Sequence, residues 1–117
     1  MGLTREMVRK MMRERNVVVL NVLSEDEYLK LRIRGSHSLP LCQNRDEFAD
    51  QAGARFGKEN FFITYSAGIT CAAGPNAAQA LRARGFRAED YPGGVQEWQD
   101  SDLPTEGLQA RHPVPSR

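Results

Sequence analysis

The sequence has little of what marks several large classes of protein. It holds two cysteines in 117 residues, too few for a disulfide framework, so we expect a domain that folds in a reducing cytoplasm. It has no apolar run near the ~20 residues of a membrane span, and its charged N-terminal stretch lacks the apolar core of a secretion signal. We therefore expect a soluble, unprocessed chain. Its 16 basic and 15 acidic side chains give a net charge of +1, which favours neither nucleic acid nor a membrane surface as a partner.

Metal-ligand spacing is also absent. The histidines His37 and His112 and the cysteines Cys42 and Cys71 form no C-x-x-C or H-x-x-x-H pattern, so we expect no metal and no other cofactor. We interpret Cys42 as a core or surface cysteine rather than a second catalytic partner. A redox pair with Cys71 would require the fold to bring the two together.

Apolar periodicity and turn residues predict helices and strands in alternation. Strands are expected at residues 17–22, 61–65 and 87–91, a short strand or turn at 33–41, and helices at 4–14, after Ser24, from Asn44 to Gly57, from Pro75 to Gly85 and after Gly94. This alternation is typical of an α/β domain with a mainly parallel sheet. We expect one domain over residues 1–107 and a flexible tail over 108–117, with mobility beginning near Thr105.

The loop from Ser66 to Cys71 is the best candidate for a site. It joins a strong predicted strand to a predicted helix, where loop N–H groups and the helix N-terminus together favour an anion. Such surroundings also lower the pKa of a thiol. Ser66 could donate a hydrogen bond to an anion but, as a hydroxyl, could not store sulfur. The expected anion-binding residues are Ser66, Ala67, Gly68, Ile69, Thr70 and Cys71.

Four motifs, taken in chain order, suggest a family. They are Asn21-Val22-Leu23 with Glu27-Tyr28; Ile33, Gly35, Pro40 and Leu41; Tyr65 to Cys71, of the form Y-C-x-x-x-x-C with serine first; and Gly93-Gly94 with Trp98 and Leu103-Pro104. In order and spacing they resemble those of the rhodanese-like (sulfurtransferase) domain family over roughly residues 5–107. The chain departs from the family's usual pattern at Asn21 and Leu23, where aspartate and arginine are common, and at Leu31 and Arg32, where glycine and histidine are.

The resemblance implies a three-layer fold with a mainly parallel sheet of about five short strands between helices. It also implies a persulfide mechanism, in which a loop cysteine takes sulfur from a donor such as thiosulfate or a persulfide-bearing protein. Ser66 stands where the family has that cysteine, so we expect sulfurtransferase activity to be lost or impaired. Either the domain has lost or rerouted its chemistry, or the serine is a deliberate substitution that holds the site unreacted.

Three other interpretations stay open beside this one. Cys71 could carry the sulfur itself, or it could be a small buried hydrophobe under the loop. The domain could instead be a non-catalytic module that binds an anion or a protein. Phosphatase or arsenate-reductase chemistry is disfavoured because no arginine lies between Ser66 and Cys71. Arg32 and Arg34 lie in the segment that resembles one wall of the family's site, and they are our candidates for contact with an anionic substrate.

Overall fold

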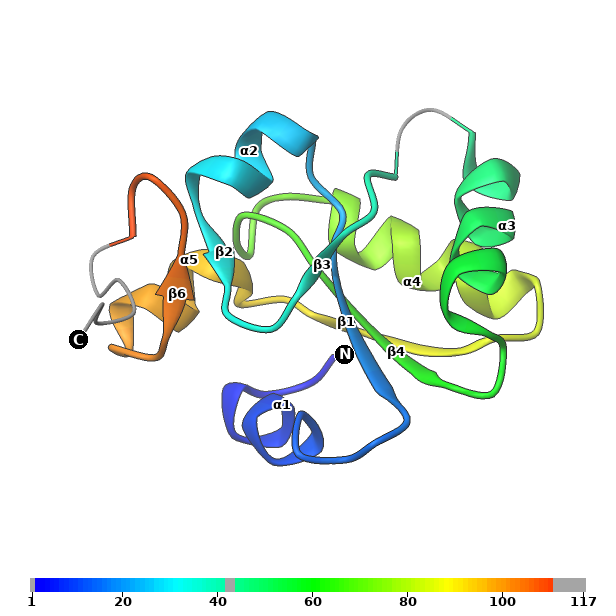
Figure 1. Ribbon diagram of the computed structural model, residues 1–117, viewed down its shortest axis with the longest axis horizontal. Helices are drawn as coiled ribbons and strands as arrows, with labels where there is room; N and C mark the ends of the chain where they lie inside the picture. The colour runs from blue at the N-terminus through cyan, green and yellow to red at the C-terminus, as the bar shows by residue number, and fades with distance from the viewer. Residues whose placement is uncertain (1, 42–43, 111–117) are drawn as a thin grey trace.

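Four short parallel strands, in the order β3-β1-β4-β5, form the central sheet of the protein (Figure 1). The computed structural model describes residues 2–41 and 44–110. Its elements are α1 (Arg5–Met11), β1 (Val17–Asn21), α2 (Glu25–Lys30), β2 (Arg32–Ile33), β3 (His37–Ser38), α3 (Arg45–Phe56), β4 (Phe61–Tyr65), α4 (Ala73–Ala83), β5 (Arg87–Tyr91), α5 (Gly94–Asp100) and β6 (Thr105–Glu106).

Local sequence signals set the ends of the helices. The side chains of Thr4, Ser24 and Asn44 each accept a hydrogen bond from a backbone N–H in the first turn of α1, α2 and α3, as predicted for N-cap residues. Gly57 follows α3 with φ of 94°, and Gly85 lies just beyond α4 with φ of 85°. Both glycines end a helix in the left-handed region that their lack of a Cβ permits.

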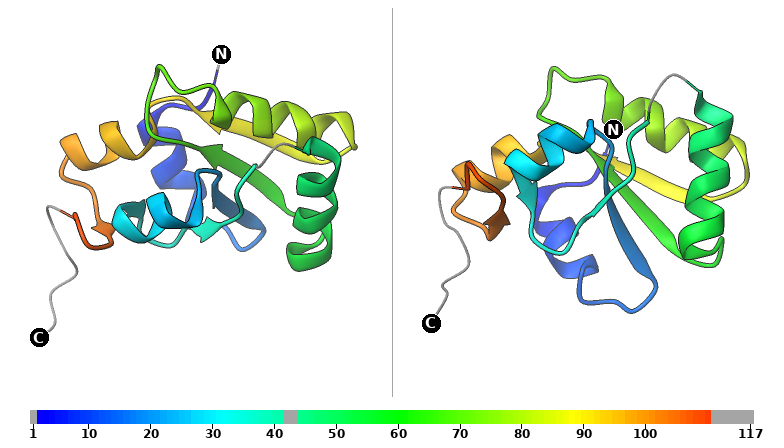
Figure 2. Two further views of the ribbon diagram at one scale, coloured as in Figure 1. Left: turned by 90° about the horizontal axis from the view of Figure 1, so that it is seen from above. Right: turned by 45° about the horizontal axis from the view of Figure 1, so that its top comes forward.

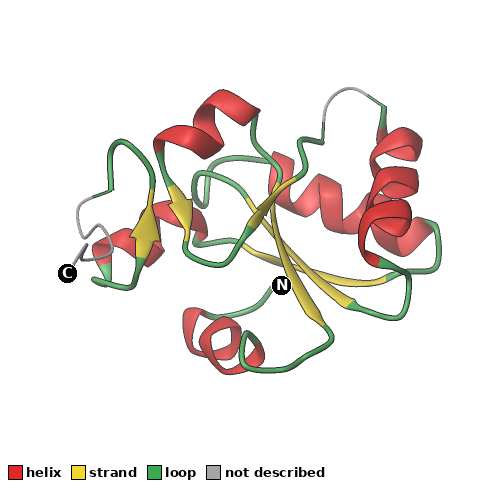
Figure 3. Ribbon diagram, viewed as in Figure 1, coloured by secondary structure: helices red, strands yellow, loops and turns green. Residues whose placement is uncertain are grey.

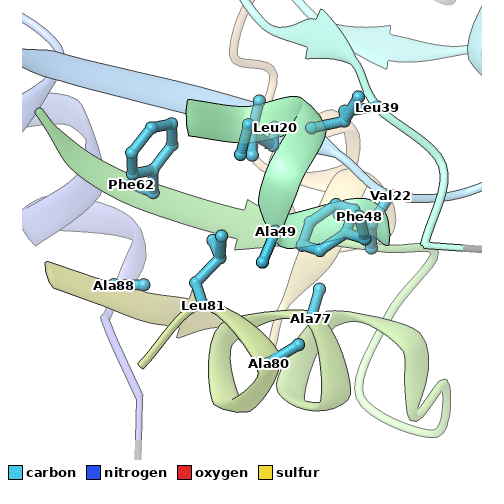
Figure 4. Packing of buried hydrophobic residues seen from close by; sticks show 11 residues of the cluster. Leu20, Val22, Leu39, Phe48, Ala49, Phe62, Ala77, Ala80, Leu81 and Ala88 are labelled. Atoms are coloured by element: carbon cyan, nitrogen blue, oxygen red, sulfur yellow. The ribbon is translucent and has the colours of Figure 1, made fainter. Parts of the chain in front are cut away.

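Helices cover both faces of the sheet, which gives three layers (Figure 3). On one face, Phe48 of α3 and Leu81 of α4 pack against Leu20 and Phe62 of the strands (Figure 4). On the other face, residues of α1 and α5, including Val8, Val95 and Trp98, form a second buried cluster with Val19, Ile63, Tyr65 and Tyr91. The predicted α/β class with a mainly parallel sheet between helices is confirmed.

The strand count differs from the expected five in one sheet. Arg32–Ile33 and Thr105–Glu106 form a separate two-stranded antiparallel sheet, β2-β6, and the central sheet has four strands. The expectation that mobility begins near Thr105 is wrong, since Thr105 is fully buried. Beyond it, the N–H groups of Leu108 and Gln109 donate to the carbonyls of Leu29 and Lys30. Residues 111–117 lie outside the described residues, so the tail proposed there remains a prediction.

The strand order places a topological switch between β1 and β4. From β1 the chain continues to β3 on one side, whereas from β4 it continues to β5 on the other. In open parallel sheets, ligands bind beyond the carboxyl ends of the strands at such a point. The loop that follows Tyr65 starts there, and in Figure 2 it projects beyond the sheet between β4 and α4.

Candidate functional site

The loop of residues 66–72 is held by the start of α5. The N–H groups of Val95 and Gln96 donate to the carbonyls of Ser66 and Ala67, both at 3.0 Å. Gly94 permits this approach: it has φ of 65°, and a Cβ there would lie 2.5 Å from the Ser66 carbonyl oxygen. Within the loop, the Cys71 N–H donates to the Gly68 carbonyl at 3.0 Å. The first loop carbonyls are therefore turned toward α5.

Ser66 lies beneath the loop rather than at its surface. Ser66 is 3 % exposed, whereas the next residue, Ala67, is exposed. The neighbours of the Ser66 side chain include polar groups, because its hydroxyl donates to the thiol of Cys71. A buried hydroxyl with this partner serves as a hydrogen-bond donor within the loop, and is not presented to a substrate in solution.

Donors converge on the sulfur of Cys71, a half-buried residue at the end of the loop. The hydrogen bond from the Ser66 hydroxyl is the largest influence and lowers the pKa of the thiol, while burial raises it. Hydrogen bonds from the N–H groups of Ala73 and Ala67 lower the pKa further, and the charge of Asp90 raises it. The net pKa lies below that of an ordinary cysteine, and this favours the reactive thiolate.

A buried polar cluster lies under the same loop, on the α4 side of the sheet. The Thr64 hydroxyl is 2.9 Å from the Gly74 carbonyl and 3.3 Å from Asp90 Oδ1. Gly74 leaves room for this cluster, because a Cβ there would collide with Asp90 Oδ1 and lie 3.3 Å from Ser66 Oγ. Burial raises the pKa of Asp90 to about 6 against the opposing hydrogen bond from Thr64.

A groove of about 770 Å³ runs along the outer side of the loop. Its wall includes Ala67 to Thr70 from the loop, Arg5 and Glu6 from α1, and Glu97 from α5. Ile69 stands on this wall with 78 % of its surface exposed. Three residues of the groove carry carboxylates, Glu6, Glu97 and Asp100, beside the single guanidinium of Arg5.

Comparison with protein families matches residues 4–101 to the Rhodanese-like domain. The chain belongs to this family. No curated protein shows significant similarity to the sequence.

Solved structures share the fold. The BH2092 protein from Bacillus halodurans is similar with a TM-score of 0.80 and 22 % identity, over 92 % of this chain and 77 % of that one. The Rhodanese-like domain of the Alr3790 protein from Anabaena sp. gives a TM-score of 0.77 at 22 % identity, over 99 % and 86 %. Protein hp1203 from Helicobacter pylori gives 0.69 at 14 % identity, over 97 % and 94 %.

The two arginines proposed as a substrate wall of this rhodanese-like domain lie in or next to β2. The Arg32 guanidinium is 3.5 Å from a carboxylate oxygen of Glu106 and 4.7 Å from the centre of the Tyr28 ring. Arg34 is exposed, and its N–H donates to the Pro104 carbonyl. These contacts tie Arg32 to β6 and α2. A role of either arginine toward a substrate stays a prediction.

A hydrogen-bonded hub at Tyr65 joins the rhodanese-like loop to β1 and β2. The Tyr65 hydroxyl accepts from Asn21 Nδ2 at 3.0 Å and from the Ile33 N–H at 2.9 Å, and lies 2.7 Å from Ser36 Oγ. Burial raises the pKa of Tyr65 to about 12, so it stays a neutral phenol. The sequence interpretation noted Asn21 only as a departure from aspartate, and it missed this hub.

Of the cysteines and histidines considered as metal ligands, Cys42 and His112 lie outside the described residues. His37 lies at β3 with its ring against Phe56. Over the described chain, no three His, Cys, Asp or Glu side chains are grouped to hold a metal ion, and none of its helices has the length and apolar character of a membrane span.

Proposed function

We propose that this rhodanese-like domain belongs to the sulfurtransferase class and carries sulfane sulfur on Cys71. Transfer at position 66 itself is lost or impaired, because serine stands there. The observation that carries the proposal is the convergence of the Ser66 hydroxyl and the Ala67 and Ala73 N–H groups on one sulfur. Hydrogen bonds to a thiolate stabilise it, and the thiolate is the form that attacks sulfur.

The chemistry needs a donor with a transferable sulfur, such as thiosulfate or a protein persulfide. The Cys71 thiolate attacks the outer sulfur of thiosulfate, a new S–S bond forms, and the old one breaks. Sulfite leaves with the electron pair of that bond, and the terminal sulfur on Cys71 keeps one negative charge. A nucleophilic acceptor then attacks the terminal sulfur and restores the thiolate. The same donors that stabilise the resting thiolate can stabilise it as the leaving group of this second step.

Mass spectrometry tests the proposal directly. The purified protein is treated with thiosulfate, desalted, digested and mapped, and we expect one added sulfur atom on the peptide that contains Cys71. Cys71→Ser should take up none there, while the matched control Cys42→Ser should keep the modification. Absence of added sulfur on Cys71 in a folded protein, with either thiosulfate or a protein persulfide as donor, would overturn the carrier role.

Position 66 is tested by restoring the thiol. Thiosulfate-to-cyanide transfer should be slow in the protein as it is, because only Cys71 can carry the sulfur, and Ser66→Cys should raise it by roughly two orders of magnitude or more. The combined variant Ser66→Cys with Cys71→Ser shows whether position 66 then acts alone. An unchanged rate in folded Ser66→Cys protein would count against placing the family's nucleophile at this position.

A non-catalytic binding module is the second candidate. The residue in the nucleophile's position favours it, because Ser66 carries a hydroxyl in place of a thiol and is only 3 % exposed. The exposed Ile69 and the groove beside it offer a surface for a protein partner. This candidate predicts a folded protein in which Cys71 takes up no sulfur.

A further inference from the structure

The hydroxyl of Thr64 faces two acceptors but holds one proton. The Gly74 carbonyl is 2.9 Å away and can only accept, while Asp90 Oδ1 is 3.3 Å away. If the proton goes to the nearer carbonyl, the Thr64 oxygen and an ionised Asp90 face each other as two acceptors. A proton on Asp90 resolves this conflict, because Asp90 can then donate to Thr64.

The burial of Asp90 supports a proton there. The residue is 5 % exposed, and its Oδ2 atom has no hydrogen-bond partner within the described part of the chain. An ionised carboxylate buried with an unpaired oxygen is costly. Burial accordingly raises the pKa of Asp90 to about 6, and Thr64 only partly offsets it.

Among the residues that the structure describes, none forms an ion pair with Asp90. Arg82 of α4 acts on it favourably, but Arg82 also lies 3.8 Å from Glu89, whose charge acts unfavourably. The groups that face Asp90 are Thr64 from β4, Gly74 and Arg82 from α4, Glu89 and the Tyr91 N–H from its own strand, and Ser66 and Cys71 from the loop.

Asp90 is also coupled to the loop. Its Oδ1 atom and Ser66 Oγ meet on the same side of Gly74, where a Cβ would touch both. The charge of Asp90 raises the pKa of Cys71, whose thiol is hydrogen-bonded to Ser66. The carboxyl and the thiol thus form an interacting pair of acids, and a negative charge on either one disfavours charge on the other.

We propose that Asp90 is a positioning residue that holds a proton beneath the loop, and that loss of this proton restrains the thiolate of Cys71 near neutral pH. The proposal rests on the proposed function only in naming Cys71 as the sulfur carrier. It adds that sulfur loading is governed by the ionisation of a carboxyl that never touches the substrate.

The test measures the alkylation rate of Cys71 by iodoacetamide against pH, with Cys42→Ser as the background in every protein. Asp90→Asn removes the charge and keeps the shape, so the thiolate fraction near pH 7 should rise roughly threefold to tenfold. In the background protein, ionisation of Asp90 should flatten the rise in rate above about pH 6. Asp90→Asn should instead show the rise of about tenfold per pH unit that a single acid gives.

Glu89→Gln is the matched control, since Glu89 is the adjacent carboxylate and is 46 % exposed. Its alkylation profile should stay within about twofold of the background, because exposed charges are screened by solvent. Identical profiles for Asp90→Asn and the background would overturn the proposal. The proposal would also be overturned if Glu89→Gln shifted the alkylation profile as much as Asp90→Asn does.

A measurement on the unsubstituted protein covers the case in which Asp90→Asn does not fold. The side-chain carboxyl carbon of Asp90, followed by NMR, should titrate with a midpoint of about 6, and a midpoint at about 4, as in an ordinary aspartate, would overturn the proposal. The proposed function fails separately. If Cys71 takes up no sulfur but its alkylation profile changes in Asp90→Asn, the coupling between Asp90 and the Cys71 thiolate is supported and the role of Cys71 as a sulfur carrier is refuted.

Discussion

At residue scale, the site divides its chemistry between two side chains. Ser66 supplies a buried hydroxyl, and Cys71, a half-buried residue, supplies a thiol whose pKa is lowered by the hydrogen bond from that hydroxyl. The sequence placed both residues in one loop and predicted that N–H groups of the loop and of the following helix would bind an anion. In the structure, the N–H groups of Ala67 and Ala73 donate to the sulfur of Cys71. Side-chain direction in an irregular loop depends on tertiary contacts, which residue spacing does not specify.

Asp90 should also affect stability. Its pKa in the folded protein, about 6, lies above the ordinary value of 3.8, so the folded state binds this proton more tightly than the unfolded state does. The contribution of this proton to the free energy of unfolding is therefore fully present below about pH 4 and is lost as pH rises toward 6. Relative to Asp90→Asn, the free energy of unfolding should fall by about 2 to 3 kcal/mol over that range.

Urea unfolding of the unsubstituted protein and of Asp90→Asn at a series of pH values measures this difference. The contributions of the other carboxylates to the pH dependence cancel, because the two proteins share them. Glu89→Gln again serves as the control, with no comparable pH-dependent difference expected. A difference that stays constant from about pH 4 to pH 7 would show that folding does not raise the pKa of Asp90.

At element scale, the junction between the loop and α5 depends on Gly94. A Cβ at this position would meet main-chain atoms of Ser66, Ala67 and Gly68 at 2.5 to 2.8 Å, and φ is 65°. Backbone cannot move aside as a flexible side chain can, so Gly94→Ala should lower the free energy of unfolding by about 2 to 4 kcal/mol. It should also change the alkylation rate of Cys71, because the loop is displaced.

Gly68→Ala is the matched control in the same loop. Its Cβ would lie 3.6 Å from the Gln96 Cβ and 3.7 Å from the Gly93 carbonyl, which are ordinary contact distances. We expect its stability to stay within about 0.5 kcal/mol of the unchanged protein. Equal losses for Gly68→Ala and Gly94→Ala in chemical denaturation would contradict the proposed junction.

The elements themselves were largely predictable, because their signals are local. Side-chain caps such as Thr4 and Ser24, and the glycine that ends α3, act within one or two turns. The strand β5 was predicted although it carries few apolar residues. Its Ala88 and Asp90 nevertheless face the same way, as the two-residue period of a strand requires. That period was the one available signal for a buried carboxyl.

At the scale of the whole molecule, the small sheet β2-β6 joins the C-terminal end to the segment after α2. Thr105 is fully buried opposite Ile33, and Glu106 pairs with Arg32. Two-residue strands that pair across more than seventy positions leave no periodic pattern, which is why the sequence interpretation missed β6. The Tyr65 hub was missed for the same reason, since its partners Asn21 and Ile33 lie far away along the chain.

Truncation tests this closure. A chain that ends at Pro104 loses the Ile33–Thr105 pairing and the backbone hydrogen bonds of Leu108 and Gln109. We expect its free energy of unfolding to fall by about 2 to 4 kcal/mol. A chain that ends at Ala110 keeps all of these contacts and should match the full chain within about 0.5 kcal/mol. Equal thermal and urea stabilities for the two truncations would show that β6 does not close the domain.

The hydrogen bond between Ser66 and Cys71 also determines how a bound sulfur can leave. Two thiols in that contact could oxidise to an internal disulfide. If one of them carried a persulfide, the other could attack its inner sulfur, form the same disulfide and release the terminal sulfur as sulfide. A hydroxyl can do neither. Sulfur on Cys71 therefore has no resolving thiol at its hydrogen-bond partner, and within this loop its release depends on an acceptor that comes from outside.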